Sequence, residues 1–204
     1  MIGENLVTLD LDAYHKSLPC LWYSTGNSKL FQETFEPEKR VLGVMGAYKP
    51  DPSTLSFLSR CIKLRKPDML VTILYQGIGV EVLRFALHNH IPTICIIPGP
   101  IRCIYPVKYR ILTTELVKKQ NGLLISAVSN QAHRGQLSQT EYIGFTALSN
   151  ILLLPQLPFN SYLIPLAVNA HNHGIKVYTR DMEVTGNRYL LKNKLAYKAM
   201  RIKD

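Results

Sequence analysis

Continuous apolar runs alternate with amphipathic segments along most of this chain, and this pattern constrains its fold more than any other feature. Runs of Val, Ile and Leu without polar alternation are what strands buried on both faces require. Amphipathic helices between such strands, with short connections, predict an α/β fold with a doubly wound, mainly parallel sheet of the extended Rossmann-like type. The expected strands are residues 40–48, 69–76, 93–99, 122–128, 150–156 and 176–180, the last of which closes the sheet.

The segments between these runs have helical periodicity. In the first, Leu55, Leu58, Cys61 and Ile62 share one face. Gly174 is expected to end the helix that begins near residue 161. The expected helices are residues 53–64, 80–90, 110–120, 140–149, 161–174 and a basic terminal helix over 187–200.

Residues 1–39 differ in character from the rest of the chain, because they hold the only Trp and lack the regular alternation. We expect residues 1–39 to form a lead-in segment that packs on the core. Residues 40–204 would then form the Rossmann-like domain. With 204 residues, 47% of them hydrophobic, the chain is long enough for one substantial core.

The charge of the chain is strongly positive, with a formal net value of +10. Such a balance favours an anionic partner, and nucleic acid is the commonest one. A basic surface without a partner fits the charge equally well, so composition alone leaves both interpretations open.

Cysteine usage and the absence of targeting signals indicate a soluble, cytoplasmic protein. Cys20, Cys61, Cys95 and Cys103 form no CxxC pair, so reduced thiols fit better than a zinc site. Cys95 lies in an apolar run and is expected to be buried. No signal peptide is visible, and no apolar stretch approaches the length of a membrane span.

Enzymatic chemistry has few candidate residues in this sequence. Gly77 and Gly79 follow a strand and open a helix, which fits either a phosphate-cradling turn or a tight turn that merely needs glycine. His88-x-His90 and His171-x-His173 lie near helix C-termini, where capping explains them better than metal binding. No nucleophile elbow, P-loop or close carboxylate pair occurs. We therefore expect a protein without catalysis, cofactor or metal.

The predicted strand ends carry small and polar residues instead. Because parallel strands place their carboxyl ends at one edge of the sheet, these residues should converge there. Glycines that permit close approach, an aromatic ring and a lysine suit a phosphate-bearing strand that stacks its bases, although an ordinary loop rim has the same composition. The residues are Gly46, Tyr48, Lys49, Gln76, Gly77, Pro98, Gly99, Ser126 and Gln156.

Residues 93–130, from "TICIIPGPIRCIYP" to "LLISAVSN", resemble the DprA/Smf family of DNA-processing proteins. In that family the third strand leads to a glycine-bearing loop, then Tyr-Pro, a helix and another strand. The likeness extends to "LPCLWYSTGNSKLF", "VMGAYKP", "SYLIPLAVNAHNHGIKVY" and "GNRYLLKNKLA", and so covers roughly residues 17–197. The resemblance implies the Rossmann-like core alone.

The resemblance also shows where this chain departs from the family's motifs. Tyr48 stands where relatives have an arginine, and Thr72-Ile73 stands where they have Ser-Gly. Gly79 replaces the acid of Gly-Ile-Asp, and Glu141-Tyr142-Ile143 replaces Arg-Asn-Arg. Cations near the predicted pocket can offset the lost arginines: Lys49, Arg102, Lys108, Arg110 and Arg134.

The function implied by the resemblance is single-stranded DNA binding without catalysis. Such a protein protects incoming DNA in natural transformation and helps to load a RecA-type recombinase. It would pair as a homodimer through its C-terminal half. The alternative is a degenerate nucleotide sensor or protein-interaction module of the same fold, and a phosphoribohydrolase is disfavoured because Pro98-Gly99-Pro100 lacks that group's signature. The expected DNA-binding residues are Gly46, Tyr48, Lys49, Gln76, Gly77, Gly99, Arg102, Lys108, Arg110 and Arg134.

Overall fold

A computed structural model of the chain describes residues 7–10, 21–104, 106–119, 121–127 and 139–200. The strands are β1 (Val7–Asp10), β2 (Leu21–Gly26), β3 (Val41–Val44), β4 (Met69–Ile73), β5 (Thr93–Ile96), β6 (Gly122–Ser126), β7 (Ile151–Leu154), β8 (Lys176–Thr179) and β9 (Tyr197–Lys198). The helices are α1 (Lys29–Glu33), α2 (Pro52–Arg65), α3 (Ile78–Asn89), α4 (Arg110–Lys118), α5 (Gln139–Ala147), α6 (Leu163–Asn172) and α7 (Thr185–Lys192), with 3-10 turns η1 (Ile101–Cys103) and η2 (Val107–Tyr109).

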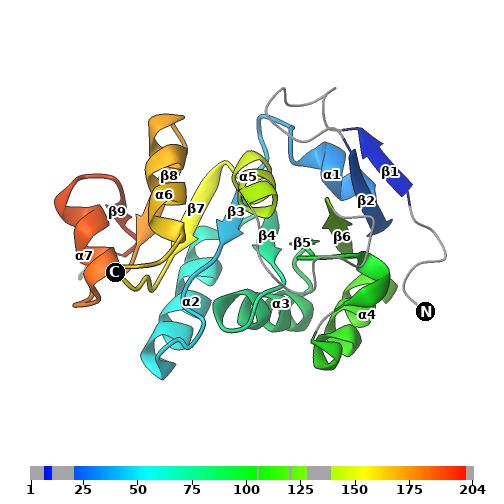
Figure 1. The fold of residues 1–204 in the computed structure, drawn as a ribbon, viewed down its shortest axis with the longest axis horizontal. Helices are drawn as coiled ribbons and strands as arrows, with labels where there is room; N and C mark the ends of the chain where they lie inside the picture. Colours follow the sequence, from blue (N-terminus) through cyan, green and yellow to red (C-terminus); the bar gives the residue numbers. More distant parts are fainter. Residues whose placement is uncertain (1–6, 11–20, 105, 120, 128–138, 201–204) are drawn as a thin grey trace.

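The strands form one sheet in the order β1-β2-β6-β5-β4-β3-β7-β8-β9. All neighbours from β6 to β9 pair in parallel, whereas β2 pairs antiparallel with both β1 and β6. The predicted doubly wound, mainly parallel α/β sheet is therefore confirmed (Figure 1). β4 is the middle strand, and the strand order changes direction between β3 and β7.

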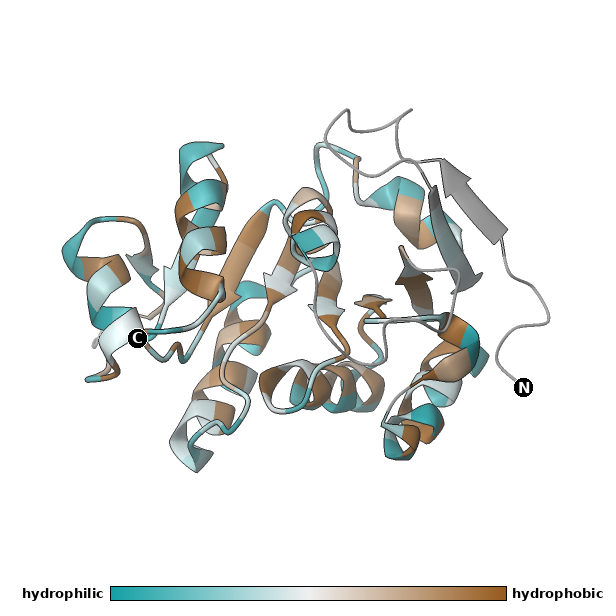
Figure 2. Cartoon of the chain, in the orientation of Figure 1, coloured by the Kyte–Doolittle hydropathy of each residue, from teal (hydrophilic) through white to brown (hydrophobic). Residues whose placement is uncertain are grey.

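Helices cover both faces of the sheet. α1, α5 and α6 lie on one face, and α2, α3 and α4 lie on the other (Figure 1). The first face buries an aromatic cluster around Trp22, Phe31 and Phe145. The brown stripes of the helices in Figure 2 turn toward the sheet on both sides, as amphipathic helices require. Cys95 is fully buried in β5, as expected from its apolar neighbours.

The C-terminal end of the sheet differs from the prediction in two ways. Residues 176–180 do not close the sheet, because β9 pairs in parallel beyond β8 through Tyr178 and Tyr197. The expected helix over 187–200 ends at Lys192, and Lys194 adopts a left-handed φ of 58°. This turn sends the chain back to β8, where the Ala199 amide donates to the Thr179 carbonyl oxygen over 2.8 Å.

The helix ends follow the predicted signals more closely. Gly174 has a φ of +79° just after α6, so it ends that helix as expected. Pro165 lies in the first turn of α6, where its missing N–H costs no helical hydrogen bond. In the part of the chain that the structure describes, no helix combines the length and apolar character that a membrane span needs.

Candidate functional site

A pocket of about 390 Å³ opens where the chain leaves β3, β4 and β5. These strands are adjacent and parallel, so the loops after them meet at one edge of the sheet. Four of the predicted DNA-binding residues line this strand-end pocket: Tyr48, Gln76, Gly77 and Lys108. Pro50, Leu55, Val80, Glu81, Arg84 and Tyr109 complete the lining.

Tyr48 presents an aromatic ring at the mouth of the strand-end pocket. Its side chain is 46% exposed, although its hydroxyl donates to Gln76 Oε1 over 2.9 Å. The Tyr75 ring meets it edge to face, with centroids 5.7 Å apart. Two neighbours therefore fix the orientation of a ring that still has an accessible surface, and such a ring is a platform for stacking.

Gly77 and Gly79 serve close packing at the start of α3. Gly77 has a φ of +90°, and a Cβ there would collide with the carbonyl oxygens of Ala47 and Tyr48. A Cβ on Gly79 would collide with the Ile73 carbonyl oxygen. The Ile78 amide at the start of the helix donates to Ala47 O over 3.2 Å. Of the two interpretations that the sequence left open, this geometry supports the tight turn.

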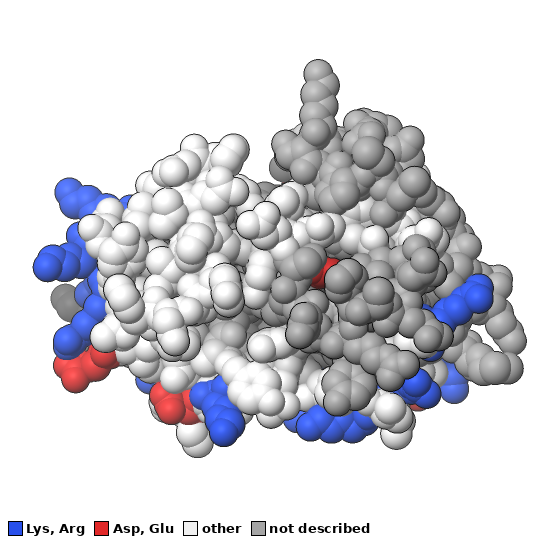
Figure 3. Space-filling view, viewed as in Figure 1, with Lys and Arg blue, Asp and Glu red and all other residues white. Residues whose placement is uncertain are grey.

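Four of the predicted cations are exposed; Lys108 lines the pocket, and Lys49 and Arg110 are next in sequence to residues that line it. Lys49 follows β3, whereas Arg102, Lys108 and Arg110 lie on η1, η2 and the start of α4. None of these four side chains forms an ion pair with any residue that the structure describes. Figure 3 shows Lys and Arg along the margin where α3 and α4 lie. Arg134 falls outside the described residues.

Two predicted glycines, Gly46 and Gly99, do not line the pocket. Gly99 is buried with a φ of +113°, and its carbonyl oxygen accepts from the Ser126 hydroxyl over 2.6 Å. Gly46 is half-buried, and a Cβ there would approach Ile78 Cγ1 to 2.9 Å. Both glycines therefore shape the strand ends on which the exposed residues stand.

Gln156 positions the loop that carries Lys49. Its Oε1 accepts from the Asp51 amide over 3.0 Å, and its Nε2 donates to Asp51 Oδ2 over the same distance. This double hydrogen bond joins the end of β7 to the start of α2. The polar residue predicted at this strand end thus holds its neighbour in place.

Several residues of the site were missed by the reasoning from sequence. Tyr75 and Tyr109 are aromatic residues at strand-end connections, and that placement was the available signal. Glu81 lines the pocket and pairs with Arg84 over 2.6 Å, which puts one acid among the cations. Acidic residues are common in the first turn of a helix, so nothing in the sequence indicated that Glu81 lines the pocket.

Glu141, Tyr142 and Ile143, which stand where relatives have Arg-Asn-Arg, lie on α5. Glu141 is buried, Tyr142 is half-buried and Ile143 is exposed. Burial raises the pKa of Tyr142 to about 12, and the charges of Tyr75, Glu141 and Tyr162 add to this rise. The Tyr142 phenol is therefore neutral at physiological pH.

Four histidines lie at the helix ends where the sequence placed them, and Cys20 falls outside the described residues. His88 and His171 are in the last turns of α3 and α6, and His90 and His173 follow as the capping residues. Burial raises the pKa of Cys61 to about 11, so that thiol stays protonated at neutral pH. Among the described residues, no three His, Cys, Asp or Glu side chains gather closely enough to hold a metal ion.

The family model of DNA recombination-mediator protein A matches residues 6–204. The chain belongs to this family, as its resemblance to DprA/Smf proteins predicted. No curated protein matches it closely enough to serve as a relative.

Solved structures of DNA processing protein A are similar over nearly the whole chain. The protein from Helicobacter pylori, whose structure reports its single-stranded DNA binding mode, gives a TM-score of 0.80 at 20% identity, covering 100% of this chain and 95% of that one. The protein from Streptococcus pneumoniae gives a TM-score of 0.75 at 16% sequence identity, and the match covers 96% of this chain and 71% of that one. The molybdenum cofactor carrier protein of Chlamydomonas gives a TM-score of 0.51 at 17% sequence identity, and the match covers 81% of this chain and 92% of that one. At these identities the likeness establishes the fold.

Proposed function

We propose that this protein binds single-stranded DNA at the strand-end pocket. The observation that carries the proposal is one pocket that holds an exposed, oriented tyrosine ring and the exposed Lys108, with Lys49, Arg102 and Arg110 exposed on the same strand-end connections. None of the four cations has an ion pair among the described residues. Lys49, Arg102, Lys108 and Arg110 can each meet a backbone phosphate. Tyr48 can stack on a base, which supplies affinity without sequence preference.

The pocket favours an unpaired strand over a duplex. A base face is free to stack on Tyr48 only where the opposite strand does not hold that base within a double helix. Lys108 Nζ lies 5.1 Å from the Tyr109 ring centroid, so a cation and an aromatic side chain meet in the lining of this pocket. Basic grooves interleaved with aromatic rings are the usual platform for single strands.

Membership of the recombination-mediator family and the single-stranded DNA binding of the Helicobacter pylori protein support the same function. We propose that the protein acts in the cytoplasm, protects incoming DNA in natural transformation and helps to load a RecA-type recombinase onto it. This role requires binding and release of a strand, and it requires no catalytic step.

A panel of ligands at low salt tests the proposed function. Fluorescence anisotropy with labelled oligothymidine should show binding, while a duplex of equal length competes less well. Free mononucleotides at the same base concentration should not compete. Tight binding of one mononucleotide with no binding of the oligomer would contradict the proposal and identify a nucleotide sensor instead.

We further propose that two copies of the chain pair through the C-terminal half. Tyr189 of α7 and Tyr197 of β9 are 39% and 56% exposed, and residues 175–204 hold eight Lys or Arg against three Asp or Glu. A symmetric contact between two such ends must place its apolar side chains at the centre and its cations at the rim. Pairing would align two strand-end pockets and raise the effective affinity for a long strand.

A further inference from the structure

The helices α2, α3 and α4 cover one face of the sheet and leave a groove between the first two. α3 packs against both α2 and α4. The groove between α2 and α3 has a volume of about 360 Å³, and we call it the α2–α3 groove. Its lining residues are Leu55, Leu58, Ser59 and Lys63 from α2, and Glu81, Phe85, His88 and Asn89 from α3.

The α2–α3 groove combines an apolar floor with a free cation at one end. Leu58 is buried, and Leu55 and Phe85 are half-buried. At the end nearest the strand-end pocket, Glu81 already has an arginine partner. At the other end, Lys63 is exposed and forms no ion pair with any residue that the structure describes. The groove therefore suits an apolar segment that carries an acid at one end.

The same chain carries such a segment on η2 and α4, which follow each other directly. Ile111 is 76% exposed, the largest fraction among the aliphatic side chains of the described residues, and Val107 is 60% exposed. Glu115 is exposed and has no ion-pair partner among the described residues. Since residues four apart lie on one side of a helix, these three side chains form a row, which we call the α4 row.

The α4 row and the groove match in length. Leu55 and Lys63 are eight residues apart on α2, and Val107 and Glu115 are also eight residues apart. At the rise of an α-helix, eight residues span about 12 Å. When Val107 lies at Leu55, Ile111 therefore reaches the middle of the groove and Glu115 reaches Lys63.

The helix directions are compatible with this alignment. α2, α3 and α4 each connect two parallel neighbours in the sheet, so all three begin at the edge that holds the strand-end pocket. Parallel packing of α4 from one copy along the groove of another therefore brings acid and cation to the same end. A two-fold axis along the helices produces this packing, because the rotation keeps their direction and gives each α4 to the other copy's groove.

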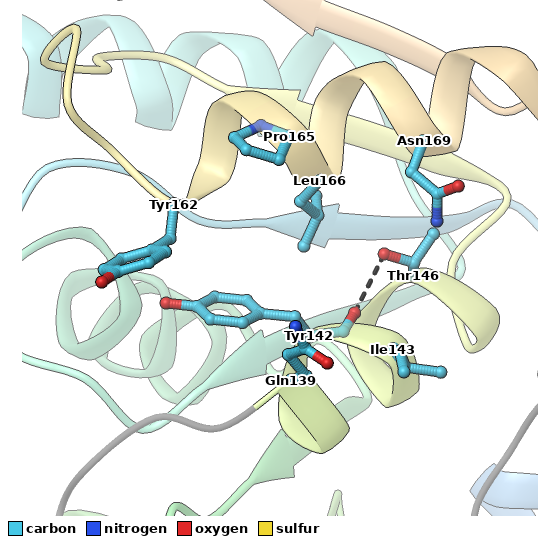
Figure 4. Close-up of a pocket in the computed structure, with 8 residues that line it drawn as sticks. All are labelled: Gln139, Tyr142, Ile143, Thr146, Tyr162, Pro165, Leu166 and Asn169. Carbon is cyan, nitrogen blue, oxygen red and sulfur yellow. Dashed lines mark hydrogen bonds between the residues drawn. The ribbon is translucent and has the colours of Figure 1, made fainter.

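A groove between α5 and α6, on the opposite face of the sheet, lacks this match (Figure 4). Its lining includes Tyr142 and Thr146 of α5 and Leu166 and Asn169 of α6. None of the described residues that line it is charged, so Glu115 would find no cation there. Charge complementarity thus favours the α2–α3 groove as the partner of the α4 row.

We propose that the α2–α3 groove of one copy binds the α4 row of a second copy. Val107 and Ile111 cover the apolar floor, and Glu115 pairs with Lys63. The contact is reciprocal, it is separate from the proposed pairing through the C-terminal half, and it does not rest on the proposed DNA binding. Both strand-end pockets then lie at the same end of the paired molecules.

Sedimentation velocity in a Tyr189→Glu background tests this contact, because that variant removes the proposed C-terminal pairing. At about 0.15 M salt, which screens the repulsion between distant cations, the average mass should double between about 10 µM and about 500 µM, the affinity range of a weak contact. A constant mass over this range would overturn the proposal.

A charge exchange tests the ion pair. Glu115→Lys and Lys63→Glu should each weaken association by roughly 5- to 50-fold, because two-fold symmetry turns two attractive pairs into repulsive ones. The double variant should regain most of the lost association. Failure of the double variant to associate better than either single variant would overturn the pairing of these residues.

Ile111→Ser tests the apolar part of the contact and should weaken association by about 10-fold or more, since each copy loses one buried side chain. The fold should persist, because Ile111 is exposed. Leu64→Ser is the matched control, since Leu64 is 61% exposed on α2 but does not line the groove. Equal effects of the two variants would contradict a specific contact and overturn the proposal.

Carbodiimide cross-linking of the wild-type protein identifies the partners directly. In a mixture of unlabelled and heavy-nitrogen-labelled chains, mass spectrometry should find peptides that join Glu115 of one chain to Lys63 of the other. Association without this cross-link would assign the contact to another surface and overturn the proposal, while the proposed DNA binding would stand.

Discussion

Tyr48 and Lys49 are neighbours with different expected roles at the end of β3. Tyr48→Ala should weaken oligothymidine binding by roughly 1–3 kcal/mol, because one base loses its stacking partner. Lys49→Ala should weaken binding less at high salt than at low salt, and should lower the salt slope by about one phosphate contact. Isothermal titration at several salt concentrations separates the two effects. Unchanged affinity in both variants would place the strand elsewhere.

Among the described residues, Glu81 is the only acid that lines the strand-end pocket, and it pairs with Arg84 over 2.6 Å. Glu81→Gln should therefore strengthen DNA binding by about 0.5–1 kcal/mol, because it removes a repulsive charge and frees a guanidinium. Glu183→Gln is the matched control, since Glu183 also pairs with an arginine but lies outside the pocket. Equal effects of the two variants on affinity would show that only net charge matters.

At the scale of secondary-structure elements, Asn187 connects α7 to the ends of β7 and β8. Its Oδ1 accepts from the Leu157 amide over 2.8 Å, and its Nδ2 donates to Pro155 O and Thr179 Oγ1 over 2.9 and 2.7 Å. Asn187 is fully buried, so Asn187→Ala leaves several polar groups unpaired.

We expect Asn187→Ala to lower the free energy of unfolding by about 2–4 kcal/mol, measured by urea denaturation. Asn193→Ala is the control, because that exposed amide donates to the Tyr189 carbonyl oxygen within its own helix. A loss below 1 kcal/mol in Asn187→Ala would contradict the connecting role.

The elements that could be predicted from sequence are those with a local signal. Continuous apolar runs predict the buried strands β4 and β5 from a few neighbouring residues. Gly174 predicts the end of α6 in the same local way. β9 has no such signal, because the turn before it uses a left-handed lysine, Lys194, and its pairing depends on β8 across the fold. The acid Glu81 lies in the site through tertiary packing alone.

At the scale of the whole molecule, pairing of two chains should be visible by light scattering at micromolar concentration. Tyr189→Glu should shift the dimer to a monomer, because it buries a charge at the centre of the contact. Ile111→Glu, at an apolar residue on α4 that is 76% exposed, should leave the dimer intact. Leu166 is unsuitable for this test, since it is 8% exposed and packs in the core. A wild-type monomer would contradict the proposed pairing.

The central claim is that a single strand binds through the cations around the strand-end pocket. Its most direct test is the slope of log K against log salt for oligothymidine, compared between wild type and a variant with Lys49, Arg102, Lys108 and Arg110 changed to Gln. Each phosphate contact contributes about 0.7 to the slope for single strands, so the variant should lose a large part of it. A variant with Lys63, Lys118, Lys176 and Lys192 changed to Gln has the same net charge and should keep the wild-type slope. Equal slopes in the two variants would contradict the account.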